Sequence, residues 1–438
     1  MYLLLLWVWL KVDSIAMFSR DSLQSFSATK KDALYDWLKR EDLNWRMLQL
    51  QTAKKVIVAT DNSRLRAFVV DDSVKVRRGK KMPGVSSHFD HLTGRFVMGQ
   101  QVLTLGLATE AQFIPLDNEI FISQKKAQPL ANEFADGRSI SAKRYRDAQE
   151  QSKPEMLRSM ISRAQRSDIH AQYFLADAWF ATKQILKMTE EKSLTAIVRM
   201  KKNKMKYRVT AAGEQSLSCT AEELYKSHVK GQWHKIHGKP YQSKSMVVEL
   251  NLAQSDKECE QWIKVKLLFV RGVNEEKQKA GKHDWALFLT TDSQLSDDKM
   301  LEIYALRWGI EVYFKEAKQK LGFLKEQSTH YSSYIASIHL TAIRFCMLLF
   351  AKHEDGGVRL SDSRNEMIKS LCTLDFASRL WGVFRALITG ALEGLKVQYG
   401  EGVTEIMRHI DRTVQQFFEQ AMQMDCFTLR LEAVSSGD

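Results

Sequence analysis

The order of apolar segments in the first half of the chain limits the fold more than any other feature of the sequence. Three extended segments, at residues 66–70, 96–108 and 112–123, precede a helical pattern at 146–166 and a fourth extended segment at 173–176. The extended segments are short apolar runs near turn residues, whereas the helical pattern is long and amphipathic. This order predicts an α/β protein with an open sheet.

Two of these strands run directly into acidic residues. Residues 66–70 are followed by Asp71 and Asp72, and residues 173–176 are followed by Asp177. The strand ends of an open α/β sheet converge on a crevice, so carboxylates placed there can meet. Taken singly, each aspartate is also a common turn former at the end of a strand.

Residues 304–318 predict an amphipathic helix with an unusual polar face. At about 100° per residue, four polar side chains share a sector about 60° wide: Tyr304, Arg307, Glu311 and Lys318. Apolar side chains cover the other side, so this helix can dock on a sheet. A carboxylate can hold a divalent metal while flanking cations grip phosphates, which suits phosphodiester chemistry. A solvated charged face is the alternative.

The spacing of these four residues resembles the signature of the insertion-sequence-4 family of DDE transposases. In that family a Tyr is followed after two residues by Arg, after three more by Glu and after six more by Lys, as it is here. The following residues 321–323, Leu-Gly-Phe, are also similar to the family. The resemblance implies an α/β fold with an RNase H-like core, interrupted by a mostly β insertion and flanked by helical N-terminal and C-terminal regions.

The resemblance also implies three catalytic, metal-binding acids: Asp71, Asp177 and Glu311. The Asp-Asp-Ser run at 71–73 is similar to the first acidic motif of the family, with Ser in place of Thr. We favour Asp71 over Asp72 because Asp71 keeps a one-residue gap to the hydroxyl residue. The expected cofactor is Mg²⁺, for which Mn²⁺ can substitute, since carboxylates are hard oxygen ligands. Without cations, three clustered carboxylates would repel one another.

The remaining signature residues are expected to bind DNA. Arg307 and Lys318 would hold phosphates near the cleaved end, and Tyr304 would contact the phosphate beside a displaced base. The family is understood to form a DNA hairpin during excision, which needs a base turned out of the stack and held by aromatic side chains. Trp308 or Trp233 could supply that stacking surface, with an ordinary core or surface position as the alternative for each.

The resemblance therefore predicts a cut-and-paste DNA transposase. Its partners would be the terminal inverted repeats of an insertion sequence and the target DNA, and it would act as a homodimer in a synaptic complex. A net charge of +13 over 438 residues fits an anionic polymer as partner, although a basic balance alone is not specific. Two alternatives stay open: a catalytically inactive transposase-derived DNA-binding protein, and a structure-specific nuclease on the same core.

Five regions are expected along the chain. Residues 1–65 would form a helical region that binds DNA ends or caps the core, and residues 66–203 would form the first part of the catalytic core. Residues 204–283 would form the mostly β insertion. Residues 284–328 would hold the last core strand and the signature helix, and residues 329–438 would be helical and mediate dimerisation.

The sequence predicts no membrane association and a prokaryotic cytoplasmic location, with nucleoid association when DNA is bound. Residues 2–10 are apolar, but a membrane-spanning helix needs about 20 residues, and the basic flank of a signal peptide is missing. They predict a buried helix. The five cysteines are scattered, which indicates neither a zinc site nor a disulfide framework. The start is expected to be abbreviated relative to family members.

Two other clusters could carry chemistry. His88 and Asp90 could meet on one face of a strand while His91 points away, and we expect this group to be structural or to face phosphates. The basic run at 201–206 is either a solvated turn or a track for a DNA backbone. Neither a Walker A loop nor a Gly-x-Ser-x-Gly motif is present, which excludes the P-loop NTPase and α/β-hydrolase classes.

Overall fold

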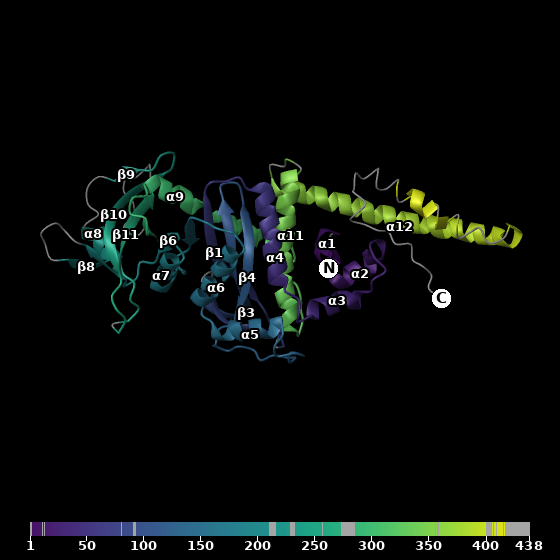
Figure 1. Ribbon diagram of the computed structural model, residues 1–438, viewed down its shortest axis with the longest axis horizontal. Helices are drawn as coiled ribbons and strands as arrows, with labels where there is room; N and C mark the ends of the chain where they lie inside the picture. Colours follow the sequence, from purple (N-terminus) through teal and green to yellow (C-terminus); the bar gives the residue numbers. More distant parts are fainter. Residues whose placement is uncertain are drawn as a thin grey trace.

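The computed structural model describes residues 2–416, except positions 11, 13, 80, 91–92, 210–215, 228–232, 256, 273–284, 355, 357–358, 400–404, 406, 409 and 415. The molecule is elongated (Figure 1). A sheet with helices on both faces forms the centre, further strands extend one end, and the long helix α12 projects from the other.

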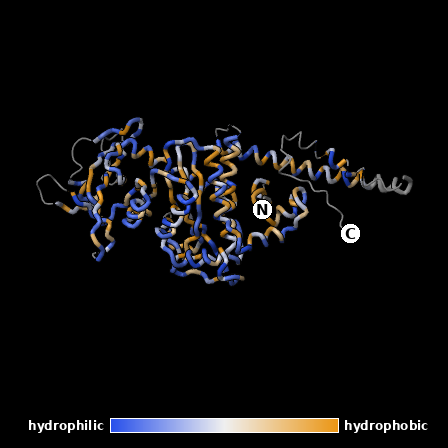
Figure 2. Tube along the Cα trace, viewed as in Figure 1, coloured by the Kyte–Doolittle hydropathy of each residue, from blue (hydrophilic) through white to orange (hydrophobic). Residues whose placement is uncertain are grey.

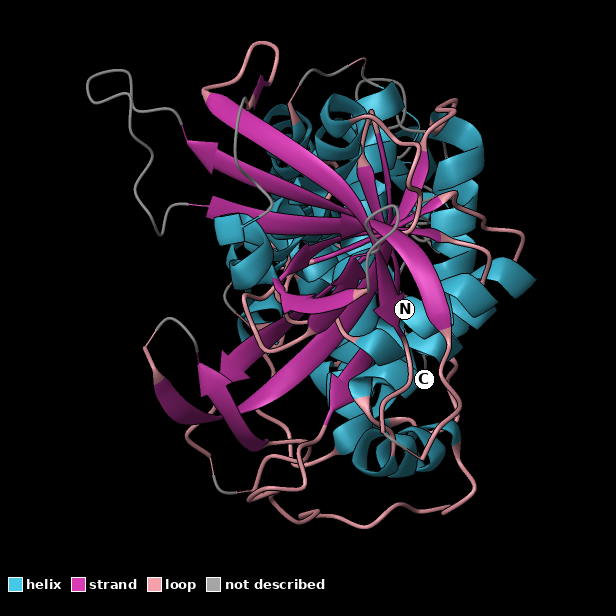
Figure 3. Cartoon of the chain, turned by 90° about the vertical axis from the view of Figure 1, so that its left-hand side faces the viewer, coloured by secondary structure: helices cyan, strands magenta, loops and turns pink. Residues whose placement is uncertain are grey.

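Twelve strands in the described residues form one continuous mixed sheet. Their bounds are β1 Arg66–Val76, β2 Ser86–Asp90, β3 Arg95–Thr109, β4 Phe113–Phe121, β5 Tyr173–Ala176, β6 Thr195–Met200, β7 Lys206–Val209, β8 Leu217–Thr220, β9 His234–Lys235, β10 Tyr241–Asn251, β11 Trp262–Gly272 and β12 Trp285–Thr290. The strands fan progressively in the view of Figure 3, as expected from the right-handed twist of strands.

The core of the sheet has the order β4-β3-β1-β5-β6. β1 runs antiparallel to β3 and parallel to β5, and β5 runs parallel to β6. This order, with helices on both faces, confirms the α/β, RNase H-like core expected from the sequence. β12 extends the core next to β6, and β7 to β11 continue the same sheet beyond it.

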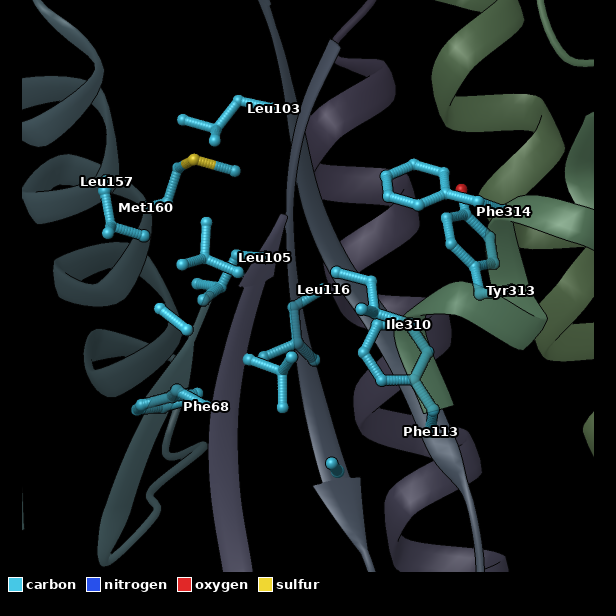
Figure 4. Close-up of a cluster of buried hydrophobic side chains, with 14 of the residues drawn as sticks. Phe68, Leu103, Leu105, Phe113, Leu116, Leu157, Met160, Ile310, Tyr313 and Phe314 are labelled. Carbon is cyan, nitrogen blue, oxygen red and sulfur yellow. The ribbon is translucent and has the colours of Figure 1, made fainter. Parts of the chain in front are cut away.

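The helices cover the two faces of the central sheet. Their bounds are α1 Tyr2–Leu6, α2 Ile15–Asp21, α3 Lys31–Lys39, α4 Trp45–Thr60, α5 Ile140–Glu150, α6 Lys153–Arg166, α7 Lys183–Glu191, α8 Ala221–Ser227, α9 Asp297–Ala305, α10 Trp308–Gln319, α11 Tyr331–Glu354 and α12 Leu360–Tyr399. α6 packs on one face, whereas α4, α10 and α11 pack on the other (Figures 1 and 4).

Each face of the sheet has its own apolar layer because successive strand residues point to opposite sides. On the α6 face, Leu103 and Leu105 of β3 meet Met160 of α6 (Figure 4). On the other face, Phe113 of β4 lies beside Tyr313 of α10, with ring centroids 5.7 Å apart. Hydrophobic residues line the strands and α11 in Figure 2, and hydrophilic ones predominate at the outer helix α5. The helices on the two faces of the sheet thus shield the central strands from water.

The helix α11 passes through the centre of the second layer. Among the described helices it is long and apolar enough to cross a membrane by length and composition, but 83% of its most apolar stretch is buried within the protein. It packs against α4, β4, α10 and α12. The N-terminal residues Leu4 and Trp7 are also buried, and Arg344 of α11 contacts the carbonyl of Leu4. The expected burial of this segment is confirmed.

A charged network ties β4 to the helices around it. The carboxylate of Glu119 contacts Arg46 of α4, and lies 3.0 Å from both Arg144 of α5 and Arg163 of α6. Arg144 in turn lies 2.6 Å from Nε2 of His339 on α11. Although burial raises the pKa of Glu119, the three guanidinium groups outweigh it and hold that pKa at about 2. Four helices are thereby fixed to one strand.

Two sequence predictions about element ends are wrong. The helix predicted at 146–166 is two helices, because Ser152 and Glu155 form a capping box and Pro154 lies in the first turn of α6. β1 does not stop at Asp71 but continues to Val76, since its antiparallel pairing with β3 continues to that residue. A polar stretch can stay in a strand when its neighbour still supplies hydrogen bonds.

Candidate active site

Asp71 and Asp177 lie side by side at the end of the parallel pairing between β1 and β5. The last pair in that register is Val70 with Ala176, so the next residue of each strand is an aspartate. Asp177 also forms a turn, because its carboxylate accepts a hydrogen bond from the backbone N–H of Trp179 at 2.9 Å. Two carboxylates distant in sequence are thus adjacent in space.

Arg307 connects this pair of aspartates to the third predicted acid. Its guanidinium lies 3.3 Å from the Asp71 carboxylate and contacts the Glu311 carboxylate one helical turn further along. The Arg307 side chain is only 16% exposed, so these contacts are shielded from water. Burial lowers its pKa, but Tyr304, Asp71 and Glu311 together raise it above the ordinary value. The positive charge of Arg307 therefore offsets part of the negative charge of Asp71 and Glu311.

The pKa of Asp71 is raised to about 7. Burial is the largest cause, and the nearby charge of Asp177 is the next. The contact with Arg307 opposes the rise without cancelling it. A carboxylate pair of this kind would be stabilised by a bound cation.

Asp72 faces the opposite side of the sheet. Its carboxylate lies 2.6 Å from Nζ of Lys153 at the start of α6 and accepts a hydrogen bond from Gln101 at 2.8 Å. Adjacent residues of a strand point to opposite faces, so Asp71 turns toward α10 and Asp72 toward α6. The two candidates for the first acid therefore have different partners.

The predicted helix 304–318 is two helices, α9 and α10, and the single-helix prediction is wrong. The break at Leu306–Arg307 is a tighter turn, in which hydrogen bonds join residues three apart. Both residues keep right-handed helical dihedrals, so the polar face survives the break. Gly309 then lets α10 approach β4, since a Cβ there would lie 2.7 Å from Cβ of Phe113.

The other signature residues surround the acids. Tyr304 is half-buried against Phe288, with ring centroids 4.9 Å apart, and burial raises its pKa. Lys318 lines the same groove as Asp71 and Asp177. Partial burial lowers the pKa of Lys318, and Asp71 opposes this effect. Trp308 is 65% exposed at the start of α10. The polar sector expected from the sequence thus adjoins both strand-end aspartates.

The donor chemistry of the three acids fits a divalent cation, because all are hard oxygen ligands and two of them repel each other. In the part of the chain that the structure describes, no three acidic, histidine or cysteine side chains are already arranged as a metal site. Arg307 engages both Asp71 and Glu311 instead. The carboxylates would have to exchange the guanidinium for the cation.

Two family comparisons match this chain. Residues 10–220 match the family described as a DDE superfamily endonuclease, and residues 123–349 match the transposase DDE domain. The second match covers just over half of the chain. The chain belongs to the DDE transposase family. Together the two matches span Asp71, Asp177 and Glu311.

A transposase acts on DNA, and DDE transposase domains generally use divalent metal ions. No curated protein matches the chain. The fold and family together make this protein a DDE transposase with an endonuclease domain. The core of the resemblance read from the sequence is therefore confirmed at the level of the DDE transposases.

The transposase has two residues at the site that sequence reasoning gave no role. Lys153 and Trp179 line the groove that also contains Asp71 and Asp177. Trp179 comes two residues after Asp177, and this position beside an acidic strand end is the signal in the sequence that points to a role at the site. Lys153 carries no spacing signal, because only the packing of α6 brings it to Asp72.

Two of the other clusters singled out in the sequence adjoin the acids: His88 and Asp90 line the groove that contains Asp71 and Asp177, and Lys201 of the basic run lies over the ring of Trp179. His88 is buried in β2, lies 3.0 Å from the hydroxyl of Ser86, and has a pKa lowered to about 4 mainly by burial. His91 lies outside the described residues. Trp233 packs under the guanidinium of Arg271 at 3.9 Å, which is a structural position in the strands beyond β12. The transposase therefore keeps His88 neutral at physiological pH.

Proposed function

We propose that this protein is a cut-and-paste transposase of the insertion-sequence-4 family. It nicks the ends of its element by hydrolysis, frees them through a hairpin and joins the 3′ ends to target DNA. The observation that carries the proposal is the meeting of Asp71 with Asp177 at the strand ends, with Arg307 joining Asp71 to Glu311. The contacts of Arg307 with Asp71 and Glu311, together with the pairing of β1 and β5, support a shared site for three acids from distant parts of the chain.

Asp71, Asp177 and Glu311 would hold Mg²⁺, or Mn²⁺ in its place. When bound, the cation activates the attacking water or 3′-hydroxyl and stabilises the leaving oxygen. Asp71 is the better candidate for the first acid because it neighbours Asp177. Asp72 is already neutralised by Lys153. The contrast in partners supports the choice made from sequence spacing.

The signature cations would bind the phosphates beside the cut. Arg307 presents a planar guanidinium, which suits bidentate contact with phosphate oxygens. Lys318 lines the groove next to Asp71 and adds a second positive charge. Tyr304 stands under the Arg307 guanidinium, with 6.0 Å between the ring centroid and Cζ, and so orients it. The half-buried Tyr304 would thus act on the phosphate mainly through Arg307.

Trp308 would stack on a displaced base during hairpin formation. Its ring is 65% exposed and begins the helix that carries Glu311. An exposed tryptophan beside a nuclease site is a ready stacking surface for an unpaired base. Trp233 is a weaker candidate because it is covered by Arg271.

The transposase would act as a homodimer on two inverted repeats. α12 projects from the body (Figure 1), and its exposed apolar residues repeat every three or four positions: Phe376, Leu380, Val383 and Leu387. This spacing is typical of a helix-pairing seam. A second copy of the chain is the proposed occupant, since synapsis needs two catalytic sites.

Cleavage of DNA that carries the element's own inverted repeats tests the proposal. Asp177→Asn and Glu311→Gln should each abolish Mg²⁺-dependent and Mn²⁺-dependent cleavage, because each removes a charged ligand while keeping its shape. Both variants should still bind the repeats in a gel-shift assay. Glu302→Gln is the matched control, since Glu302 lies on α9 with its side chain 61% exposed and forms an ion pair with Lys299 on the same helix.

Three outcomes would reject the proposal. Full cleavage by either acid variant at saturating Mg²⁺ would exclude these acids as ligands. Binding of the repeats by wild-type protein without any cleavage in either metal would favour a catalytically inactive DNA-binding protein. Cutting of branched DNA regardless of repeat sequence would instead indicate a structure-specific nuclease.

A further inference from the structure

A groove leads from the paired aspartates across the α6 face of the sheet. It has a volume of about 900 Å³ and is bordered by β2, β3, the start of α6 and the loop after β5. Asp71, Asp177 and Lys318 are among the residues that line it. Sites of this size bury small organic groups. The groove is therefore large enough to hold one part of a ligand while another part of the same ligand contacts Asp71 and Asp177.

Aromatic rings also line this groove. Phe89 and Phe96 face each other across the β2–β3 pairing, with centroids 5.3 Å apart, and are 43% and 68% exposed. Trp179 contributes a ring that is 46% exposed, and Phe121 completes the wall. Exposed apolar surface gathered in one concave place marks an interaction site.

Cations accompany the rings. Nζ of Lys153 lies 5.1 Å from the centroid of Phe121 and 5.4 Å from that of Trp179. Nζ of Lys201, on the basic run after β6, lies 4.1 Å from the centroid of Trp179, and Lys125 also lines the groove. Lys153 is paired with Asp72 and Asp90 also lines the groove, so the positive charge offered to a DNA strand comes mainly from Lys125 and Lys201.

We infer that this groove binds an unpaired stretch of DNA strand next to the scissile phosphate. The inference rests on the proposed function and names the form of DNA that this side of the site accepts. Flat rings gain little from a duplex, whose base faces are already stacked, but they stack on unpaired bases. The adjacent ammonium groups match the phosphates of the same strand. A protein partner would need no such alternation of rings and cations.

Equilibrium binding in Ca²⁺ tests the inference without depending on cleavage. Fluorescence anisotropy would compare a duplex with an unpaired single-stranded tail against a blunt duplex of the same sequence. The double variant Phe89→Ala, Phe96→Ala should weaken binding of the tailed DNA by at least about tenfold, since each stacked base contributes about 1–3 kcal/mol. Binding of the blunt duplex should change less than about twofold. Phe350→Ala is the control, because Phe350 is also 43% exposed but lies on α11, across the sheet.

The results separate this inference from the proposed function. Equal weakening for tailed and blunt DNA, or no weakening for either, would overturn it even if the wild type cleaves normally. A wild type that never cleaves would reject the proposed function while the difference in binding could still be measured. If the double variant does not fold, wild-type protein can be photocrosslinked to bromouracil placed in the unpaired tail. Adducts at Phe89, Phe96 or Trp179 are expected. Adducts only at other residues would refute binding of the tail in this groove.

Discussion

Replacing Asp71 by asparagine is expected to stabilise the metal-free transposase above neutral pH. Burial, followed by the charge of Asp177, raises the pKa of Asp71 from 3.8 to about 7. A carboxyl group whose pKa is higher in the folded than in the unfolded state contributes to the stability of the folded protein. This contribution is fully present when the pH is below the unfolded pKa. That contribution is lost as the pH rises through the folded pKa. The wild-type protein therefore loses stability between about pH 4 and pH 8 through this one group.

The size of the effect follows from the two pKa values. An interval of about three pH units corresponds to roughly 4 kcal/mol in the free energy of unfolding. The amide oxygen of asparagine can still accept the hydrogen bond that the backbone N–H of Asp72 donates at 2.8 Å. Because the amide is neutral, the asparagine loses part of the electrostatic attraction that the Asp71 carboxylate has to Arg307, 3.3 Å away. The net gain at pH 8 should thus be on the order of 2–4 kcal/mol.

Urea unfolding in EDTA at pH 5 and pH 8 provides the measurement. Asp71→Asn should be much more stable than wild type at pH 8, and the difference should shrink to about 1–2 kcal/mol at pH 5, because the wild type has by then lost only the part of the contribution that lies between the unfolded pKa and pH 5. Mg²⁺ should narrow the gap at pH 8, because a cation that binds the folded wild type stabilises it. The control is Asp72→Asn, which leaves the ammonium of Lys153, 13% exposed, without its carboxylate partner. That variant should lose stability at both pH values.

Either of two results would contradict this prediction. Asp71→Asn could prove less stable than wild type at pH 8 in EDTA, which would mean that Asp71 is not held beside Asp177 in a largely buried position. Alternatively, the two asparagine variants could respond to pH in the same way, which would remove the distinction between the two faces of β1. In both cases the assignment of Asp71 as the first acid would lose its physical support.

Three further predictions concern contacts around the site. Arg307→Gln should raise the affinity of the DNA-free protein for Mn²⁺ by about tenfold in calorimetric titration, since Arg307 contacts two of the three acids; an unchanged or lower affinity would contradict this. Gly309→Ala should destabilise the protein by about 1–3 kcal/mol and reduce cleavage, because the new Cβ would meet Phe113 at 2.7 Å; normal thermal unfolding would refute the close approach of α10. Glu119→Gln should cost about 3–5 kcal/mol in urea unfolding, because the buried Arg144 would lose its carboxylate partner while Arg46 and Arg163 keep Asp117; a loss below about 1 kcal/mol would show that the network is not structural.

One strand could be read from the sequence to the residue. Tyr173–Ala176 has the predicted bounds. It is a short apolar run, and Phe174, Leu175 and Ala176 are fully buried, so composition alone marks its ends. β1 was harder, because its second half is polar and stays extended only through pairing with β3. An element that depends on its neighbour for hydrogen bonds leaves a weak local signal.

The break between α9 and α10 was not predicted. The turn at Leu306–Arg307 keeps helical dihedrals, so the periodicity of the side chains continues through it and the sequence pattern reads as one helix. The spacing of Arg307 and Glu311 was nevertheless informative, since residues four apart on a helix are neighbours. Their contact is present in the structure.

The sequence by itself determined which chemical groups each element carries: carboxylates after two short strands, and a polar face of fixed spacing on a later helix. Tertiary structure alone decided which of these groups meet. The register of β1 with β5 sets Asp71 beside Asp177, and the packing of α6 draws Asp72 to Lys153 instead. Side chains alternate along a strand as a local rule. Which face a given side chain shares with distant residues depends on strand order and helix packing, and these are fixed only by burial of the whole core.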